Sequence, residues 1–431
     1  MSITTVNKLA RRLSWLIAAI LVLLPFHAIF STWAGSNFGH LDVWRVWKEI
    51  LLLLALPFIA WYVMLSKPAR TWLKRSPIVK LFAAYVLLHL LLGVWVLSQH
   101  KVNQTAFIYA LIINLRFIGF FIFCAAVCIH SDFLLRHWRK ILLVPAGVVV
   151  AFGLLQKFLL PYDFLRHFGY GPKTIPAYQT VDANLDYRRL QSTLRGANPL
   201  GAYLVLVVSA ITLYVWKSRT YFLFIVGGLI LLFFSYSRSA ELGLVISLVF
   251  LAWASGFIFP KRWWAMVGVG LVIFIAGLAF FLRSNSGIQD TILHTSNSST
   301  SLRSSNAERL RAMENGAQDI LRQPFGTGPG TAGPASFRNN HPPRIAENYF
   351  LQVGQEVGVI GMALFIAINI LVARGLWQKR SDQLAQLLLA SLIGLTFVNL
   401  LSHAWTDDTI SYIWWGLAGV AIAPRLLTKT K

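Results

Sequence analysis

Residues 346–361, AENYFLQVGQEVGVIG, join a long polar segment to a strongly apolar one. The apolar segment is long enough to cross a bilayer as a helix, which takes about 20 residues. Glu347 therefore stands where an aqueous loop is expected to meet the lipid boundary. Because an ionisable group at that depth is costly, it indicates a functional site, and chemistry on a lipid-linked substrate needs such a group.

The whole chain has the composition of a polytopic membrane protein. Of its 431 residues, 56% are hydrophobic and only 13% are charged, whereas a soluble domain needs a far more polar surface. We expect an all-α fold of about 12 transmembrane helices, which form a single domain over residues 1–431. The expected spans are residues 14–33, 44–65, 78–98, 106–129, 140–160, 198–216, 220–236, 240–259, 264–282, 349–373, 383–402 and 408–424.

The net charge of +23 follows from the orientation of these spans. Lys and Arg are enriched in cytoplasmic links, and a cytoplasmic N-terminus with Lys8, Arg11 and Arg12 makes every second link basic. We therefore expect both termini in the cytoplasm, and attribute the charge to topology and anionic lipid, not to nucleic acid. The basic links and tail contain Lys67, Arg70, Lys74, Arg75, Lys80, Arg136, Arg139, Lys140, Lys217, Arg219, Lys261, Arg262, Arg374, Lys379, Arg380, Arg425, Lys429 and Lys431.

Two long outer loops are expected, at residues 161–197 and 283–346, and the second is expected to cover the substrate. Within it, residues 307–322 have the spacing of an amphipathic helix. Residues 324–334, PFGTGPGTAGP, follow as a compact irregular turn without the Gly-Lys-Ser/Thr of a nucleotide-binding loop. The expected apolar face of the helix consists of Leu310, Met313, Ala317 and Ile320 or Leu321.

Arginines gather on the expected outer side, close to the lipid boundary. The stretch RRLQSTLRGANPLGA carries Arg188, Arg189 and Arg195, and the stretch SYSRSAELG carries Arg238. An enzyme that handles a lipid phosphate or pyrophosphate needs planar, permanently charged donors at this level, and guanidinium groups bind phosphate bidentately. The alternative for each arginine is an ordinary surface or interfacial position.

Arg116 lies in the middle of the expected span at residues 106–129. A charge there faces a cavity or a partner, so we expect either a substrate role or an ion pair with Glu241 or Asp407. Asp407 and Asp408 begin the last span. Adjacent aspartates at a helix start are typical of an interaction with the helix dipole, and metal binding is the alternative.

Two further groups of polar residues lie near the outer boundary. Glu49 is expected to form a local ion pair with Lys48 or Arg45, and binding of a lipid head group is the alternative. His341 precedes two prolines in an exposed turn, and a loop histidine near a reactive carboxylate could act as a second base.

Three short motifs follow one another within roughly residues 185–365: Arg189 with Asn198-Pro199-Leu200, then Ser237-Arg238-Ser239, then Glu347, Asn348, Leu351, Glu356, Gly358 and Gly361. Gly326, Gly328 and Gly330 precede the third motif. In this order the chain resembles the superfamily of O-antigen ligases and O-antigen polymerases, which are bacterial membrane glycosyltransferases. That family has an Arg–Gly/Ser–Thr–Asn–Pro stretch, a Ser-Arg-Gly turn and the pattern His-Asn-x-x-Leu-x-x-x-x-Glu-x-Gly-x-x-Gly.

The resemblance implies a fold similar to the GT-C-like ligases and polymerases, and a metal-independent transfer without a cofactor. The implied donor is a glycan on undecaprenyl pyrophosphate, at the outer face of the bacterial inner membrane. Arg189 and Arg238 are expected to hold the pyrophosphate, and Glu347 is expected to act as general base toward the acceptor hydroxyl. Glu356 falls on another helical face and is expected to be structural. Further substrate contacts are expected from Arg188, Arg195, Asn348, Arg116 and His341.

The third motif also departs from the family. Ligases that transfer O-antigen to lipid A-core carry His where this chain has Glu347. We therefore expect a polymerase of surface-polysaccharide repeat units, with a glycan acceptor, the lipid bilayer and a chain-length regulator as partners. The alternatives are a ligase that acts on lipid A-core or protein, and a flippase for lipid-linked glycans, which the span count and Arg116 also suit. Against the flippase, the charges gather at one face and not at the midplane.

Overall fold

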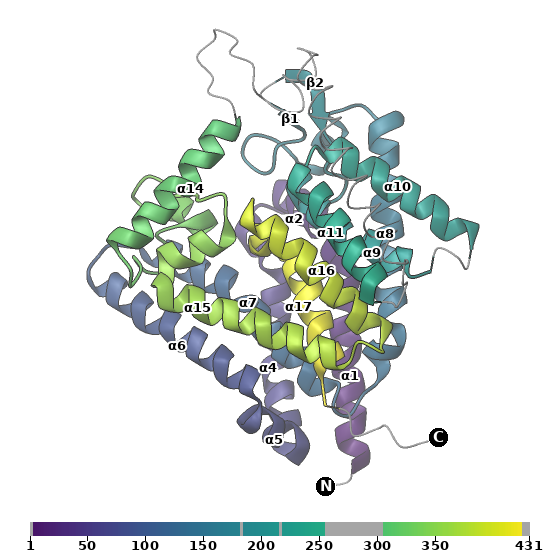
Figure 1. Cartoon of the computed structure of the whole chain (residues 1–431), viewed down its shortest axis with the longest axis vertical. Coiled ribbons are helices and arrows are strands. Elements are labelled where there is room, and N and C mark those ends of the chain that lie inside the picture. The colour runs from purple at the N-terminus through teal and green to yellow at the C-terminus, as the bar shows by residue number, and fades with distance from the viewer. Residues whose placement is uncertain (1–2, 182–183, 215–217, 255–304, 425–431) are drawn as a thin grey trace.

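The computed structural model describes residues 3–181, 184–214, 218–254 and 305–424, and helices account for most of them (Figure 1). The expected span at residues 264–282 lies outside the described residues, as do the end of the span at 240–259 and residues 283–304 of the second outer loop. Also outside are the basic residues Lys217, Lys261, Arg262, Arg425, Lys429 and Lys431.

The first part of the chain is a series of helices joined by short turns. A 35-residue apolar element, Thr4–Phe38, is interrupted at Pro25, whose ring fixes φ and removes a backbone donor. It consists of α1 (Ile3–Leu23), η1 (Leu24–Phe26) and α2 (His27–Phe38). After it come α3 (Leu41–Arg45), α4 (Trp47–Leu65), α5 (Lys67–Arg75), α6 (Pro77–Ser98), α7 (Gln104–Val127) and α8 (Phe133–Phe158).

The outer loop expected at residues 161–197 contains a small β-hairpin that the sequence did not predict. Its elements are η2 (Phe164–Phe168), β1 (Gln179–Val181) and β2 (Asn184–Arg189). The strands are antiparallel, with Gln179 opposite Arg189. Gln179 also accepts a hydrogen bond from the backbone N–H of Ala197 at 3.1 Å, which ties the hairpin to the next helix. Arg189 is thereby brought close to the start of that helix.

The second part of the chain builds the core around two short, almost completely buried helices, α9 and α17. α17 packs along α7, and α11 packs along α16 (Figure 1). Small residues allow this approach, since a Cβ at Gly243 would lie 2.9 Å from the carbonyl oxygen of Gly394. The elements are α9 (Ala197–Thr212), α10 (Arg219–Ser235), α11 (Arg238–Ala254), α14 (Ser305–Arg322), η5 (Gly333–Arg338), α15 (Tyr349–Gln378), α16 (Gln383–Leu400), η6 (Ala404–Thr406) and α17 (Asp408–Ile422).

Among the described residues, seven helical segments are long and apolar enough to cross a membrane. Four further helices that match expected spans, α9, α10, α11 and α17, have 15 to 17 residues. Three of them, α9, α10 and α17, are shorter than the roughly 20 residues that a bilayer requires, and α11 is described only as far as Ala254. The chain is therefore a multi-pass, mostly helical membrane protein, and the count of about 12 spans stays a prediction.

Helix α15 is broken near Gly358, where the backbone has φ +71° and ψ −174°. A Cβ at this position would lie 2.3 Å from the carbonyl oxygen of Pro324, so only glycine fits. The glycine-rich turn bonds the groups that the break frees. The N–H of Val359 donates to Pro324 at 2.9 Å, and the N–H of Gly328 donates to the carbonyl of Glu356 at 2.7 Å. Such partners make a break in a membrane helix tolerable.

The Glu356 side chain fastens the same turn from inside the protein. Its buried carboxylate accepts hydrogen bonds from the backbone N–H of Gly330 at 2.7 Å and from the amide of Asn114 at 2.6 Å. Glu356 thus joins α15, α7 and the glycine-rich turn, which is the structural role that the sequence suggested for it.

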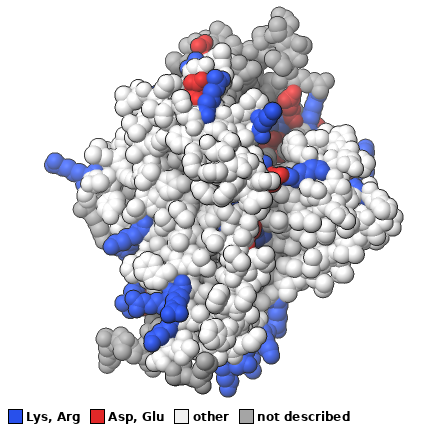
Figure 2. Space-filling view, turned by 180° about the vertical axis from the view of Figure 1, so that it is seen from behind, with Lys and Arg blue, Asp and Glu red and all other residues white. Residues whose placement is uncertain are grey.

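Charged side chains lie mainly toward the two ends of the molecule. Figure 2 shows a broad surface with few charges between them, and a concentration of Lys and Arg at the end where α1 begins. Figure 1 places α5 at that end as well, and β1 and β2 at the opposite one. The exposed basic residues of α1 and α5 are Lys8, Arg11, Arg12, Lys67, Arg70, Lys74 and Arg75. This distribution is what a membrane protein with one basic face requires.

The break in α15 predicts a specific sensitivity. Gly358→Ala should lower the stability by about 2 kcal/mol or more, because the left-handed backbone and the Pro324 carbonyl both exclude a Cβ. The measurement is the midpoint of thermal unfolding of the purified protein in detergent. Gly119→Ala in α7 is the matched control, since a Cβ there meets nothing within 4 Å. Equal midpoints for the two variants would contradict the account of the break.

Candidate active site

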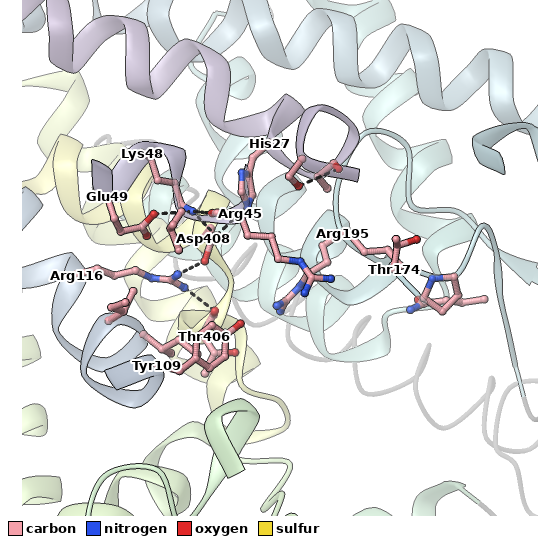
Figure 3. A pocket seen from close by; sticks show the side chains of 18 residues that line it. His27, Arg45, Lys48, Glu49, Tyr109, Arg116, Thr174, Arg195, Thr406 and Asp408 are labelled. Carbon is pink, nitrogen blue, oxygen red and sulfur yellow. Dashed lines mark hydrogen bonds and ion pairs between the residues drawn. The ribbon is translucent and has the colours of Figure 1, made fainter. Parts of the chain in front are cut away.

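A buried group of charged side chains joins α2, α4, α7 and α17 (Figure 3). The Arg116 guanidinium bonds the Asp408 carboxylate and donates to the Thr406 carbonyl at 2.6 Å. The Lys48 ammonium lies 2.7 Å from the same carboxylate, and His27 Nε2 lies 3.1 Å from it. The Arg116 and Lys48 side chains are only 5% and 1% exposed. Each charge is therefore held by its partners, because an unpaired charge at this depth is strongly unfavourable.

The ion-pair partner of Arg116 is Asp408, and not Glu241 or Asp407 as the sequence analysis expected. Asp407 instead caps the N-terminus of α17, where its side chain accepts from two backbone N–H groups. The two aspartates are neighbours in the sequence, so only the direction in which α17 begins decides which one faces α7. The expectation that these aspartates interact with the start of the helix is met by Asp407.

A cavity of about 360 Å³ opens beside this charged group. Figure 3 shows the side chains of Arg45 and Arg195 reaching toward one another along it. Glu49 forms the expected local pair with Lys48, at 3.1 Å. Four Lys or Arg side chains and two carboxylates line the cavity, so its electrostatic balance favours an anionic occupant.

A smaller cavity of about 160 Å³ shares Gln179 and Arg195 with the larger one. Asn198, His403 and Asp407 also line it. Arg195 Nε lies 3.7 Å from the Asp407 carboxylate, which holds this guanidinium between the two cavities. The first motif of the sequence thus contributes both Arg195 and Asn198 to one cavity wall.

Arg189 is used mainly to hold the polypeptide in place. Its Nε donates to the carbonyl of Ser235 at 2.9 Å, and one Nη donates to the side-chain oxygen of Asn198 at 2.6 Å. Burial, together with the nearby guanidinium groups of Arg309 and Arg238, lowers the pKa of Arg189 to about 10. Three arginines from distant parts of the chain therefore gather here, and a bound anion would relieve their mutual repulsion.

The turn that carries Arg238 is held by close helix packing. α9 approaches it at Gly201, where a Cβ would lie 2.7 Å from Ala240 Cβ and 2.9 Å from Ser237 Cβ. Tyr236, just before the turn, has a left-handed φ of 50°. The second motif thus presents its arginine from a rigid corner at the start of α11.

Glu347 precedes α15 and is fixed beside the loop that joins α16 to α17. Its own backbone is left-handed, with φ +51°, a conformation that costs a residue with a Cβ about 1–2 kcal/mol. The next two residues anchor it. Asn348 caps α15 and donates from its amide to the carbonyl of Leu400 at 2.9 Å. The N–H of Tyr349 donates to the carbonyl of Ser402 at 3.1 Å.

These anchors bring His403, the residue after Ser402, into the electrostatic neighbourhood of Glu347. Burial lowers the pKa of His403. The Glu347 carboxylate opposes this shift, while Arg195 and Arg309 add to it. Its Nδ1 is buried and has no hydrogen-bond partner in the described part of the chain. The sequence analysis assigned His403 no role, and its only signal was its place among polar residues at the outer end of a span.

Arg309, one of the arginines of the second outer loop, is a second residue that the sequence analysis did not place at the site. The side of α14 that faces α15 includes Gly316, where a Cβ would lie 3.1 Å from Ala346 Cβ. Arg309 lies two turns earlier on the same side. The predicted face was wrong at Leu310, which is 59% exposed, whereas Ile320, one of the two alternatives for its last position, is buried. α14 therefore directs an arginine, and not only apolar residues, toward the site.

Not every predicted residue joins this group. Arg188 is exposed and its guanidinium lies 4.1 Å from the centre of the Tyr162 ring, because neighbours along a strand point to opposite faces. His341 is exposed, in the turn after η5. Arg116 lines the larger cavity but is bound within the buried charged group. Asn348 is engaged as a helix cap.

The structure thus combines a helical membrane fold with arginines that gather near Glu347 and His403. Residues 204–366 match the family described as O-antigen ligase, a membrane family of ligases and polymerases. This stretch is therefore similar to the glycan-transferring membrane enzymes of the O-antigen ligase and polymerase type, the family that the sequence motifs resemble. No protein of curated function matches the sequence. Arg238, Arg309 and Glu347 lie within the matched residues, and Arg195 and His403 lie outside them.

The buried charged group predicts a large difference between two arginine variants. Arg116→Leu should destabilise the protein by about 3–5 kcal/mol, because Asp408 loses its principal partner in a buried position. Arg136→Ala, which removes a 73% exposed arginine paired with Asp132, should cost less than about 1 kcal/mol. Thermal unfolding in detergent measures both. If Arg116→Leu melts like the wild type, the pair does not stabilise the fold.

Proposed function

We propose that the protein is a polymerase of O-antigen-like polysaccharide repeat units, which uses donors linked to undecaprenyl pyrophosphate on the outer face of the inner membrane. The observation that supports this proposal is the convergence of three motifs at one place. The positive charges of Arg238 and Arg309 lower the pKa of Arg189. Arg309 also lowers the pKa of His403, and the Glu347 carboxylate raises it. A glycosyltransferase needs both kinds of group in one site: cations that stabilise the leaving group, and a basic group that accepts the proton of the acceptor hydroxyl.

In this proposal the arginines bind the pyrophosphate of the donor. Arg238, Arg309 and Arg195 contact its oxygens and stabilise the negative charge that develops as the sugar leaves. Arg189 has a supporting part, because its hydrogen bonds to Ser235 and Asn198 hold the corner that carries Arg238. Guanidinium groups supply the positive charge that a metal ion supplies in other transferases, so we propose a metal-independent reaction.

The acceptor hydroxyl binds next to Glu347, whose carboxylate orients or deprotonates it. Glu347 stands at the N-terminus of α15, where the helix dipole favours a negative charge. The segment 305–346, with α14, covers the sugar chain from the outer side. Asn348 keeps Glu347 in position through the cap and through its bond to Leu400.

The choice between polymerase and ligase rests on Glu347, which stands where lipid A-core ligases of the family carry His. A ligase is the second candidate, because the matched family is described as O-antigen ligase. Reconstitution with lipid-linked repeat units separates the functions. A ladder of longer glycans supports the polymerase, and transfer only to lipid A-core supports the ligase. Movement of the lipid across the bilayer without glycan transfer would support a flippase.

The proposal predicts that Arg238→Ala and Glu347→Gln each abolish glycan chain extension. The first variant removes charge stabilisation of the leaving group, and the second removes the carboxylate at the acceptor. Polymer length in cells is measured by gel electrophoresis, with protein level and unfolding midpoint as controls. Full polymer length in the Glu347→Gln variant would exclude the role given to this carboxylate.

α14 offers a matched pair of arginines for a second prediction. Arg309→Ala should lower the initial rate of transfer about 100-fold, because it removes a donor from the pyrophosphate. Arg311, two residues on, is exposed on another side of the helix, so Arg311→Ala should retain the wild-type rate. Purified variants in liposomes with lipid-linked repeat units provide the measurement. Equal rates for the two variants would remove α14 from the donor site.

A further inference from the structure

The loop at residues 401–407 holds a histidine where the proposed reaction needs a base. Two hydrogen bonds, from Tyr349 to Ser402 and from Asn348 to Leu400, bind this loop to the segment that follows Glu347. Both bonds are close in sequence to the two ionisable side chains, so the position of His403 relative to Glu347 is fixed by the backbone. The connection does not depend on the two side chains themselves.

One ring nitrogen of His403 makes no hydrogen bond to the described part of the protein. Its Nδ1 is buried without a hydrogen-bond partner in the described residues, and its side chain lines the cavity of about 160 Å³. Buried polar atoms in native proteins almost always have partners, and an exception calls for a bound group or a catalytic role. Asn198 and Arg195 line the same cavity, so a sugar hydroxyl there would meet both polar donors and the imidazole.

We propose that His403 is the general base of the transfer, and that Glu347 is the carboxylate that orients its ring and stabilises its charged form. This inference rests on the proposed glycosyl transfer and refines the part that Glu347 plays in it. The family's ligases place a histidine in the third motif. In this chain that position is a glutamate, and a histidine in the loop between α16 and α17 lies within its electrostatic influence.

The chemical step is a displacement at the anomeric carbon of the donor sugar. The acceptor oxygen forms a bond to that carbon while the bond from the carbon to the pyrophosphate oxygen breaks. The electron pair of the broken bond stays on the pyrophosphate, next to Arg238 and Arg309. The hydroxyl proton moves to His403, which becomes an imidazolium beside the Glu347 carboxylate and later releases the proton to water.

Three charged residues, Glu347, Arg195 and Arg309, influence His403 electrostatically. Glu347 precedes α15, Arg309 lies on α14, Arg195 precedes α9, and Asp407 is paired with Arg195 in the same loop. Burial and the two arginines keep the pKa of His403 below its ordinary value of 6.5, so the ring is neutral at pH 7 and can accept a proton. The rate should therefore be steady near pH 7 and fall as the pH drops through this lowered pKa.

The decisive experiment exchanges the two side chains. In liposomes with lipid-linked repeat units, His403→Ala should lower kcat about 100-fold or more with little change in KM. Adding Glu347→His to this variant places an imidazole where the family's ligases carry one. The double variant should have a rate at least about tenfold higher than that of His403→Ala alone. The backbone allows this change, because histidine adopts the left-handed conformation more readily than glutamate. His167→Ala, at an exposed histidine on the outer side, should behave as the wild type.

Two outcomes would overturn the inference: a His403→Ala rate within about threefold of the wild type, or a wild-type rate with no acid limb attributable to a histidine. If His403→Ala does not fold, His403→Gln replaces it, since glutamine keeps a polar side chain but cannot take the proton. Full activity of that variant overturns the inference in the same way. A wild-type protein that transfers no glycan contradicts the proposed function itself, whereas active His403 variants contradict only the role of His403.

Discussion

A charged side chain buried inside a membrane protein needs an oppositely charged partner in contact with it, and Arg116 and Asp408 form such a pair. The pair links α7 to α17, and Lys48 and His27 add α4 and α2 to the same carboxylate. The other side of the Arg116 guanidinium binds the carbonyl of Thr406, so the charged group also shapes the loop before α17. The walls of both cavities therefore depend on an interaction that takes no part in the proposed chemistry.

The polar backbone of the second outer loop meets a related constraint. A break in α15 exposes peptide groups that lipid cannot satisfy, and the glycine-rich turn satisfies them because it has no side chains in the way. Glu356 completes the arrangement from inside the protein. The turn and the helix are thus a single unit, and α14 is joined to α15 by the hydrogen bond that the Gln355 amide donates to the Asp319 carboxylate at 2.7 Å. Structural and catalytic demands meet in one stretch of sequence.

The sequence predicted those parts of the molecule that short-range patterns determine. Apolar runs located α4, α6 and α7 within a few residues. The motifs pointed to Arg238 and Glu347, whose roles stay predictions, and both lie near residues that Arg309 also influences electrostatically. The sequence could not predict which aspartate faces Arg116, because the direction of α17 depends on packing. It missed Arg309, since the face of α14 was assigned from apolar residues such as Leu310, which the structure exposes. The β-hairpin has too few residues for a recognisable pattern.

The left-handed backbone at Glu347 has an evolutionary consequence. Residues such as Asn, Asp and His adopt this conformation more readily than Glu, so random substitution would tend to relax the strain at this position. The glutamate here thus adopts a backbone conformation that its residue type disfavours. A substitution of Glu347 by histidine would therefore add no backbone strain. A histidine could therefore replace Glu347 without any rebuilding of the helices around it.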